Sequence, residues 1–331
     1  DITLTVTATT REANGAPASV SHDLSVHFEG VGGIDVMRGG AGNDTMVGGS
    51  GIDFVDFSDA SNAVFVSLFS GEATGNGYDT FTNVEGVIGS SFGDSLNGNN
   101  GDNIFNGGGG ADVIYAFDGN DVIMDGTGAD TVFGGVGNDT IVAGADGNVD
   151  VYNGGSGFDV VDYSGMSSAI SVDFISGGVQ GSGARDQLTS IEQVVGTSFN
   201  DSFVGGKGDD NFVGGAGNDV FNGGRGYDVM TGGAGADTFV FHSVDVLSGQ
   251  IKYGFDTITD FGAGDRLDFD DLLNGVRERD IGRYVHLTEV DAGTMVSVDF
   301  GGNAGFVDVV LLEGMHGIDI DDLTAGGHIV I

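Results

Sequence analysis

Aspartates recur every nine residues over much of this sequence, and their spacing is the first feature with chemical meaning. The nine residues from Gly39 read GGAGNDTMV, and the nine from Gly48 read GGSGIDFVD. An aspartate offers a carboxylate on a short side chain, and glycine turns offer carbonyl oxygens. Together they supply the oxygen-only ligands that Ca2+ prefers. A stack of such turns would therefore bind a series of calcium ions.

The nine-residue frame occupies residues 30–56, 89–142, 154–162 and 196–240, which makes fifteen units. Position 6 is aspartate in fourteen of them, and Asn103 is the exception. The position-6 aspartates are the candidate metal ligands: Asp35, Asp44, Asp53, Asp94, Asp112, Asp121, Asp130, Asp139, Asp159, Asp201, Asp210, Asp219, Asp228 and Asp237.

Position 8 of every unit is large and apolar, which shows that the period is a structural constraint. These residues are Met37, Met46, Val55, Leu96, Phe105, Ile114, Ile123, Val132, Ile141, Val161, Phe203, Phe212, Phe221, Met230 and Phe239. Glycines at positions 1, 2 and 4 permit bends with positive φ, and the last three residues predict a short strand that points position 8 inward. One unit buries almost nothing, so the units must stack.

This pattern resembles the RTX nonapeptide GGxGxDxUx over roughly residues 30 to 243. The resemblance implies an all-β fold, a parallel β-roll in which two units make one turn and aspartates eighteen residues apart share a calcium ion. We expect roughly eight to ten ions. The implied pairs are Asp35–Asp53, Asp94–Asp112, Asp112–Asp130, Asp121–Asp139, Asp201–Asp219, Asp210–Asp228 and Asp219–Asp237.

Two irregularities and one alternative qualify this interpretation. Asn103 opposite Asp121 predicts a weaker site. The eleven-residue unit between Val142 and Gly154 predicts a bulge, with Asp139 and Asp159 as a candidate stacked pair despite a separation of twenty. The alternative is that the aspartates only cap their own turns. Capping alone would leave the charge of a stacked column uncompensated.

Composition excludes several classes of partner. Ten Lys+Arg face fifty Asp+Glu among 331 residues, a net charge of −40, which disfavours nucleic acid and anionic membranes. No run approaches the ~20 apolar residues of a membrane span, so we expect no membrane insertion, and we expect a monomer. The chain has no cysteine, and its acids are 42 Asp and 8 Glu, a bias toward turns rather than helices.

The roll is duplicated. The sequence from Asp53 aligns with the sequence from Asp159, at a spacing of 106 to 107 residues. Each copy contains a stretch without nonapeptides, about residues 57–88 and 163–195, whose period-2 alternation predicts strands that continue or flank the roll. Glu85 and Glu192 occupy matching places, as calcium ligands or as solvated or turn-bonded side chains.

The two ends differ from the roll. Residues 1–29 resemble the terminal strands of a preceding immunoglobulin-like repeat, around a loop with Asn14-Gly15, so we expect the chain to be part of a longer protein. We assign the duplicated roll to residues 30–243. Residues 244–331 resemble the C-terminal cap and type I secretion signal of RTX proteins, in which Asp256 and Asp260 match the calcium-binding DxxxDF motif. A small β domain that ends in a hydrophobic strand, residues 329–331, fits equally.

We find no HExxH, no GxSxG and no ligand-like histidine spacing, so we expect no enzyme. The resemblance implies a calcium-dependent folding and secretion module of an extracellular or cell-surface bacterial adhesin, with calcium and the type I secretion machinery as partners and roles in cell adhesion and biofilm. The alternative is a polysaccharide-binding accessory module of a secreted enzyme such as a mannuronan epimerase. We expect weak or absent glycan binding, because no aromatic or basic cluster recurs along the roll.

Overall fold

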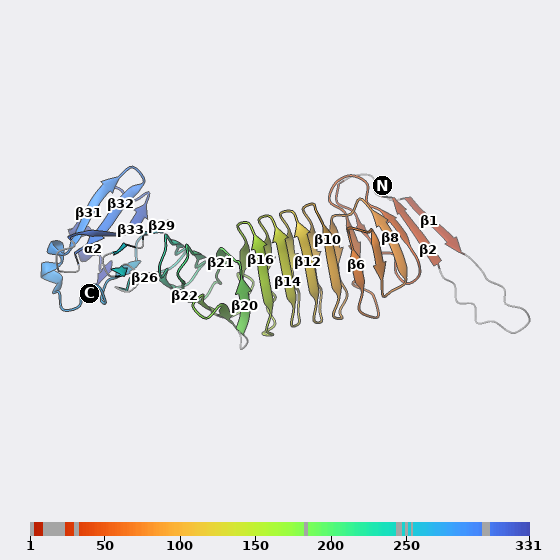
Figure 1. Cartoon of the computed structure of the whole chain (residues 1–331), viewed down its shortest axis with the longest axis horizontal. Helices are drawn as coiled ribbons and strands as arrows, with labels where there is room; N and C mark the ends of the chain where they lie inside the picture. The colour runs from red at the N-terminus through yellow and green to blue at the C-terminus, as the bar shows by residue number, and fades with distance from the viewer. Residues whose placement is uncertain are drawn as a thin grey trace, which may run out of the picture. The chain divides into compact units, whose positions relative to one another are not determined.

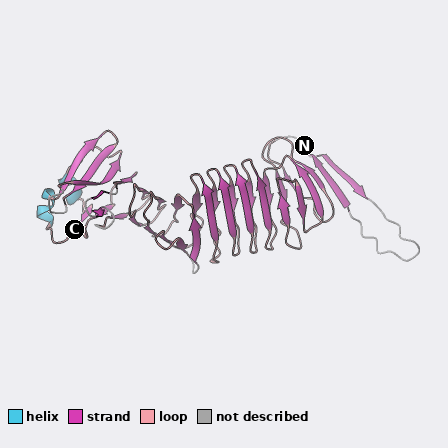
Figure 2. Cartoon of the chain, viewed as in Figure 1, coloured by secondary structure: helices cyan, strands magenta, loops and turns pink. Residues whose placement is uncertain are grey.

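The computed structural model describes residues 3–8, 24–29, 33–181, 185–242, 247–248, 251–252, 254–299 and 305–331. Strands dominate its regular structure (Figures 1 and 2). The chain divides into two compact units: residues 1–160 with 188–191, and residues 161–187 with 192–331. Among the described residues, no helix is both long enough and apolar enough to span a membrane. The predicted all-β fold is confirmed.

The first unit is a parallel β-roll made of two sheets. Strands that are neighbours in a sheet are one coil apart in sequence, so Leu96 lies opposite Ile114 and Phe105 opposite Ile123. One sheet runs in the order β1 (Thr3–Ala8), β2 (Leu24–Glu29), β4 (Thr45–Val47), β8 (Tyr78–Thr82), β7 (Glu72–Thr74), β6 (Phe65–Ser67), β10 (Ser95–Asn99), β12 (Val113–Asp118), β14 (Thr131–Val136) and β16 (Val151–Ser156). The other contains β3 (Val36–Met37), β5 (Phe54–Asp56), β9 (Gly86–Ile88), β11 (Ile104–Asn106), β13 (Val122–Met124) and β15 (Thr140–Val142).

The first stretch without nonapeptides forms three strands inside the roll. β6, β7 and β8 pair antiparallel with one another, while β8 pairs in parallel with β4 and β6 in parallel with β10. The insert therefore replaces one coil and passes the parallel register on to the next repeat. Its prediction as strands that continue the roll is confirmed.

Glycine is required where successive turns touch. Gly128 has φ +144°, and a Cβ atom there would collide with the carbonyl oxygen of Gly110, one coil earlier. Gly235 repeats this contact with Gly217 in the second unit. The repeated glycines thus allow turns to stack with backbone against backbone.

The N-terminal strands join the first sheet. β1 and β2 pair antiparallel, as expected for a hairpin, and β2 pairs in parallel with β4, with Phe28 opposite Met46. The expected loop at Asn14-Gly15 lies outside the described residues. The immunoglobulin-like origin of this hairpin and the boundaries at residues 29 and 243 stay predictions.

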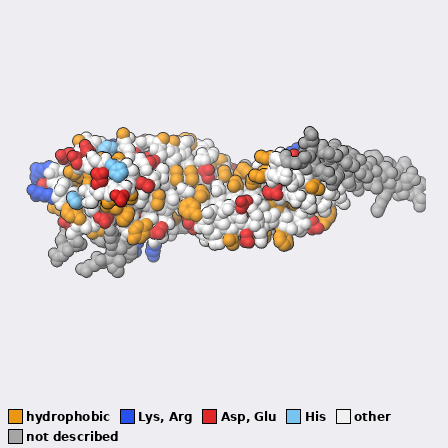
Figure 3. Space-filling model, turned by 90° about the horizontal axis from the view of Figure 1, so that it is seen from above, with side chains coloured by type: hydrophobic (Ala, Val, Ile, Leu, Met, Phe, Trp, Pro, Cys, Tyr) orange, Lys and Arg blue, Asp and Glu red, His pale blue; other side chains and the backbone are white. Residues whose placement is uncertain are grey.

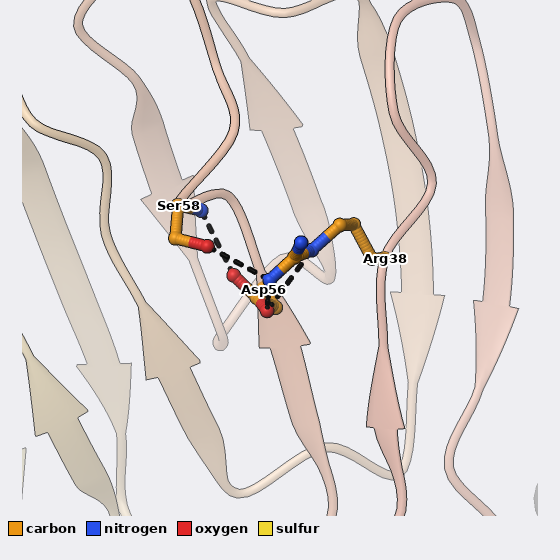
Figure 4. A network of polar contacts seen from close by, with 3 residues as sticks. All are labelled: Arg38, Asp56 and Ser58. Atoms are coloured by element: carbon orange, nitrogen blue, oxygen red, sulfur yellow. Dashed lines mark hydrogen bonds and ion pairs between the residues drawn. The ribbon is translucent and has the colours of Figure 1, made fainter.

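An ion pair bridges the first two coils of the second sheet (Figure 4). Arg38 Nε donates to Asp56 Oδ2 over 3.1 Å, and its Nη2 donates to the same oxygen and to Ser58 Oγ. Burial raises the pKa of the Asp56 carboxyl, but hydrogen bonds from Ser58 and Arg38, with the charge of Arg38, outweigh it and hold that pKa below its usual value. The pair links β3 to β5.

The second unit repeats the roll and then closes it. Its first sheet contains β18 (Ser171–Asp173), β19 (Gly178–Gln180), β22 (Ser202–Val204), β24 (Val220–Asn222), β26 (Thr238–Val240), β30 (Arg266–Asp268) and β34 (Ile329–Val330). Its second runs β21 (Gln193–Val195), β23 (Asn211–Val213), β25 (Val229–Thr231), β29 (Asp256–Ile258), β33 (Val307–Glu313), β32 (Gly293–Val298) and β31 (Val285–Val290). β17 (Val160–Asp162) and β20 (Arg185–Thr189) contain residues of both units. β27 (Leu247–Ser248) and β28 (Ile251–Lys252) form a short antiparallel pair.

The C-terminal residues cap both sheets of the second unit. β33 continues one sheet by pairing in parallel with β29 and leads into an antiparallel meander, while β34 pairs in parallel with β30. A 3-10 helix, η1 (Glu278–Arg283), and a short helix, α2 (Ile320–Ala325), complete the cap. This covers strand edges that an open roll would leave unpaired.

The core is the row of position-8 side chains. All fifteen of the predicted residues are at most 1% exposed. In the second unit they include a stack of aromatic rings, with Phe203 and Phe221 centred 4.8 Å apart and Phe221 and Phe239 5.1 Å apart. The nine-residue frame is therefore confirmed as the packing period.

Candidate metal site

The position-6 side chains lie one above another where the coils turn. In each stacked pair, the backbone N–H of one residue donates to the Oδ1 of the aspartate one coil later, over 2.7 to 3.0 Å for the predicted pairs. Asn103 donates to Asp121 in the same way, and Asp139 donates to Asp159 over 2.8 Å although they are twenty residues apart. The structure therefore brings the predicted pairs together. Their binding of metal stays a prediction.

The stacked position-6 side chains form columns along the roll, which we call the aspartate columns. These columns also contain carboxylates outside the predicted set. Asp79 accepts from the N–H of Asp44, and Asp150 accepts from that of Asp130. Asp265 accepts from Asp237 in the second unit. None of the three belongs to a regular nonapeptide, so the nine-residue frame could not find them. Asp150 and Asp265 directly precede short strands, and Asp79 lies at the start of β8.

Glu85 is a turn-bonded side chain, one of the two roles that the sequence allowed for it. Its Oε2 accepts from the N–H of Asp53 over 3.0 Å, the place that a position-6 aspartate takes elsewhere. The N–H of Ile104 in turn donates to its carbonyl oxygen. Glu85 therefore bridges the insert within its column as a turn-bonded side chain.

The second carboxylate oxygen marks where a cation fits. Oδ2 is buried and has no hydrogen-bond partner in nine of the predicted aspartates: Asp35, Asp53, Asp112, Asp121, Asp130, Asp139, Asp219, Asp228 and Asp237. Glycine at position 1 makes room for this atom, because a Cβ at Gly107 would lie 2.5 Å from Asp112 Oδ2. In the described part of the chain, no Lys, Arg or His side chain forms an ion pair with these nine aspartates.

Burial without a counter-charge raises the pKa of these carboxyls. Desolvation raises the pKa of Asp112 to about 8, and neighbouring carboxylates add to it. The same causes raise the pKa of Asp121 and Asp219 to about 7, and that of Asp130 and Asp139 to about 6. A buried anion needs a compensating charge. Oxygen ligands of this kind suit Ca2+, so the residues present fit that ion.

Some column members already have both oxygens satisfied. Asp94 accepts from the N–H of Ser90 at Oδ2, and from the Ser90 hydroxyl and the Val64 N–H at Oδ1. Asp201 is held in the same way by Thr197. These two aspartates begin the regular repeats after the inserts, so a local side chain compensates for the missing preceding turn.

The side-chain amide of Asn103 forms hydrogen bonds within its own turn. Its Oδ1 accepts from the N–H of Asn99 over 2.9 Å, and its Nδ2 faces Asn99 Oδ1 at 3.4 Å. A neutral amide with internal partners offers less to a cation than a carboxylate with an unpaired oxygen. The structure thus agrees with the expected weakness of this position.

One unit, DGTGADTVF, departs from the nonapeptide pattern and adds a carboxylate beside the aspartate column. Asp125 stands at position 1, where thirteen of the fifteen units have glycine and one has Ala116. Its ligand atom lies within 4.8 Å of those of Asp130 and Asp150. The Tyr152 hydroxyl donates to Asp125 Oδ2. Burial raises the pKa of Asp125 to about 7. Its sequence signal was the aspartate in place of a glycine in the unit DGTGADTVF.

The two aspartates of the predicted terminal motif have different environments. Asp256 Oδ1 accepts from the N–H of Asp228 over 3.2 Å, which makes it a column member. Asp260 accepts from the N–H groups of Gly232 and Gly233 through its two oxygens. Asp260 therefore ties the preceding turn to the cap, and its role as a calcium ligand stays a prediction.

Position 5 forms a second ladder that the sequence analysis missed. The N–H of Asn120 donates to Asp102 Oδ1, and that of Asn138 donates to Asn120 Oδ1. In the second unit Asn218 donates to Asn200. The signal was the Asn or Asp that precedes the position-6 aspartate in these units. This ladder ties the turns together without contributing to the aspartate columns.

Comparison with known families agrees with this geometry. A model described as the RTX calcium-binding nonapeptide repeat matches residues 27–55, 88–116, 115–149, 195–230 and 213–242. The repeat region belongs to the RTX calcium-binding nonapeptide family. The matched residues include all the position-6 aspartates except Asp159.

Two solved structures are similar to parts of this chain. One is the AlgE6R3 subunit of the mannuronan C5-epimerase of Azotobacter vinelandii, at 32% identity and TM-score 0.31, covering 42% of this chain and 76% of that one. The other is the extracellular lipase LipA of Serratia marcescens, at 17% identity and TM-score 0.25, covering 76% of this chain and 40% of the lipase. The search of curated proteins found no match.

Proposed function

We propose that this chain is a calcium-dependent folding and secretion module of an extracellular bacterial adhesin, acting in cell adhesion and biofilm, monomeric and without enzymatic activity. The observation that carries the calcium switch is the row of buried Oδ2 atoms without partners, such as those of Asp112 and Asp219. They belong to aspartates with raised pKa values. A fold that stacks unpaired carboxylates depends on a cation for its charge balance.

The columns make folding conditional. Without a cation, fifty acids against ten Lys+Arg repel one another, and each nonapeptide buries only one position-8 side chain. The conformational entropy of 65 glycines opposes folding further. Bound calcium, roughly eight to ten ions, supplies positive charge between the turns and stabilises only the folded state. Calcium therefore controls whether the roll forms.

This dependence suits export. Among EF-hand proteins, extracellular calcium modules have dissociation constants of ~0.1–1 mM. The calcium concentration of the cytosol is far lower than this. The chain would therefore stay unfolded inside the cell and fold outside. Type I secretion machinery is the proposed partner. We infer that the cap folds first and supports the preceding turns, because Asp256 and Asp260 bond to the backbone of the last nonapeptides.

Circular dichroism of the chain in millimolar calcium and in EGTA tests the switch. At neutral pH or above we expect the β-roll signal only with calcium, and an unchanged signal in EGTA at that pH would overturn the proposal. Asp256→Ala with Asp260→Ala should raise the calcium midpoint of folding more than the control Asp35→Ala does. Equal midpoints for the two variants would refute nucleation at the cap.

The adhesin and secretion roles need a cellular test. A strain that produces the full-length protein without residues 244–331 should retain it inside the cell and lose biofilm mass. Deletion of residues 30–56 leaves the cap intact and serves as the control. Normal export without residues 244–331 would refute the secretion role, and normal biofilm despite lost export would refute the adhesin role.

A further inference from the structure

An uncharged pocket of about 410 Å3 lies on the outer face of the first unit. Its lining residues are Phe65, Ser67, Phe69, Asn97, Gly98, Asn99, Asn100 and Phe117. The strand register brings them together, because β10 lies between β6 and β12, with Asn99 opposite Phe117. The pocket thus sits where three neighbouring coils meet, wholly within one unit.

Aromatic side chains face solvent around this pocket. Phe69 is 80% exposed, Phe65 48% and Phe117 47%. Next to them, Tyr115 stacks on Phe133 with ring centroids 4.8 Å apart and planes 3° apart. The expectation from sequence concerned aromatic clusters that recur along the roll and therefore missed this single cluster of the first unit. Its members are scattered in the sequence and meet only through the register.

Phe117 has a strained backbone. Its φ is +79°, and among the described residues only Asn83 and Ser190 are other non-glycine residues with positive φ. The equivalent position of the second unit is Gly224, at φ +93°. A bulky side chain is costly in this conformation, and such strain is typical of functional positions. We therefore infer that Phe117 is kept at this position for a function and not for the stability of the fold.

We propose that this pocket binds a neutral sugar ring of a glycan. The flat faces of Phe65, Phe69 and Phe117 suit the C–H faces of a pyranose, and the amides of Asn99 and Asn100 suit its hydroxyls. The lining contains no charged group, whereas the whole chain carries −40, so an anionic sugar would be repelled. A stable protein interface uses about 20–30 residues from each partner, whereas eight residues line this pocket. A sugar is therefore a better occupant than a second protein.

The second unit offers an internal contrast. Its equivalent pocket, of about 470 Å3, is lined by Phe174, Ile175, Gly206, Lys207 and Arg225. Ile175 replaces Phe69, Lys207 replaces Asn100 and Gly224 replaces Phe117. Lys207 thus adds a cation at a matching position, Arg225 adds a second one where the first unit has Asp118, and the pocket has fewer aromatic rings. Lys and Arg side chains are few on the face drawn in Figure 3.

The test is calorimetric titration of the full chain in saturating calcium with neutral manno-, gluco- and galacto-oligosaccharides. We expect one of these series to bind, and Phe117→Gly to weaken its Kd at least tenfold while thermal stability stays equal or rises. Phe69→Ser should weaken binding similarly and serves if Phe117→Gly does not fold. Tyr227→Ala removes an exposed aromatic side chain of the second unit, 58% exposed, and should leave Kd unchanged.

Three results would overturn the assignment. One is the absence of binding by every neutral series. Another is binding that survives both Phe117→Gly and Phe69→Ser. The third is a wild-type dimer in light scattering that dissociates in Phe117→Gly, which would assign the surface to a second copy of the chain. None of these readouts depends on secretion or adhesion.

Discussion

At three matching strands of the two copies, β10, β12 and β14 against β22, β24 and β26, aromatic side chains occupy opposite faces of the sheet. In the second unit, Phe203, Phe221 and Phe239 stack in the core. In the first unit the corresponding core positions are aliphatic, Leu96, Ile114 and Val132. Tyr115 and Phe133, one residue after Ile114 and Val132, point outward and stack there.

This difference teaches what a one-residue shift does in a strand. The side chain at position 8 points inward and that at position 9 points outward. An aromatic ring at position 8 therefore packs in the core and stabilises the fold, whereas a ring at position 9 forms part of the outer surface. The backbone of the roll tolerates both arrangements, since each strand pairs with its neighbours in the same parallel register. Function can therefore differ between the copies while the scaffold is kept.

The copies also differ in their aspartate columns. The second unit is regular from Asp201 to Asp237, whereas the first contains Asn103 at position 6 and Asp125 at position 1. The first also accommodates the eleven-residue unit before Gly154. We expect calcium affinity to be more uniform in the second unit.

Removing one central carboxylate from each copy should give the largest effect. Asp112 and Asp219 each lie between two column neighbours, so Asp112→Ala or Asp219→Ala should remove about two bound ions and weaken the calcium midpoint at least tenfold, or about 1.4 kcal/mol. Calorimetry gives the ion count, and hydrogen exchange should show loss of protection in the altered unit only. Asp118→Ala, at an exposed position 3, is the control. Unchanged stoichiometry in both variants would contradict the column assignment.

The calcium-free chain should gain structure in acid. Its folded-state pKa values, about 6 to about 8 in both units, lie above the ordinary 3.8 of aspartate. The folded state therefore binds more protons, so its stability is greatest below about pH 4 and is lost as pH rises toward 8. Circular dichroism in EGTA from pH 4 to 8 measures this loss. β signal that instead increases with pH would contradict it.

Asn103→Asp should make the first unit more like the second, where Asp210 takes this place. We expect about one additional ion and a lower calcium midpoint, because the new carboxylate stacks on Asp121. In EGTA the same variant should be less stable than wild type, since Asn103 Nδ2 no longer faces Asn99 Oδ1. Asn106→Asp, outside the columns, controls for charge. A higher stability in EGTA would refute this explanation.

The smallest effect belongs to the ion pair at the start of the first unit. Arg38→Ala should lower the melting temperature only slightly in calcium, since the guanidinium is half exposed. Because the pKa of Asp56 is lowered in the folded state, the ion pair stabilises the fold fully at a pH above the ordinary aspartate pKa of 3.8. This stabilisation is lost once acid protonates the carboxyl group. Scanning calorimetry from pH 7 downwards should show a difference between wild type and variant that is largest at pH 7 and decreases as the pH falls below about 4. A difference at pH 3 of equal size would indicate a packing role.

The amino-acid sequence by itself determined the repeating parts of this protein. A nine-residue period places glycine, aspartate and an apolar residue at fixed points of a coil, so the core residues could be predicted from spacing. The resemblance of this period to the RTX nonapeptide implied the stacked aspartate pairs. Even Asp139 and Asp159 stack, because an extra two residues fit within a turn without breaking the register. Local periodicity is enough wherever each coil contacts only its neighbours.

Only the tertiary structure decided the features that depend on irregular register. Asp79 and Asp265 enter the columns through separations of 35 and 28 residues, which no fixed period predicts. Phe69 and Phe117 meet because an inserted meander sets β6 beside β10. Such contacts depend on where an insert returns the chain to the sheet, and that position follows from packing among distant strands rather than from any local pattern.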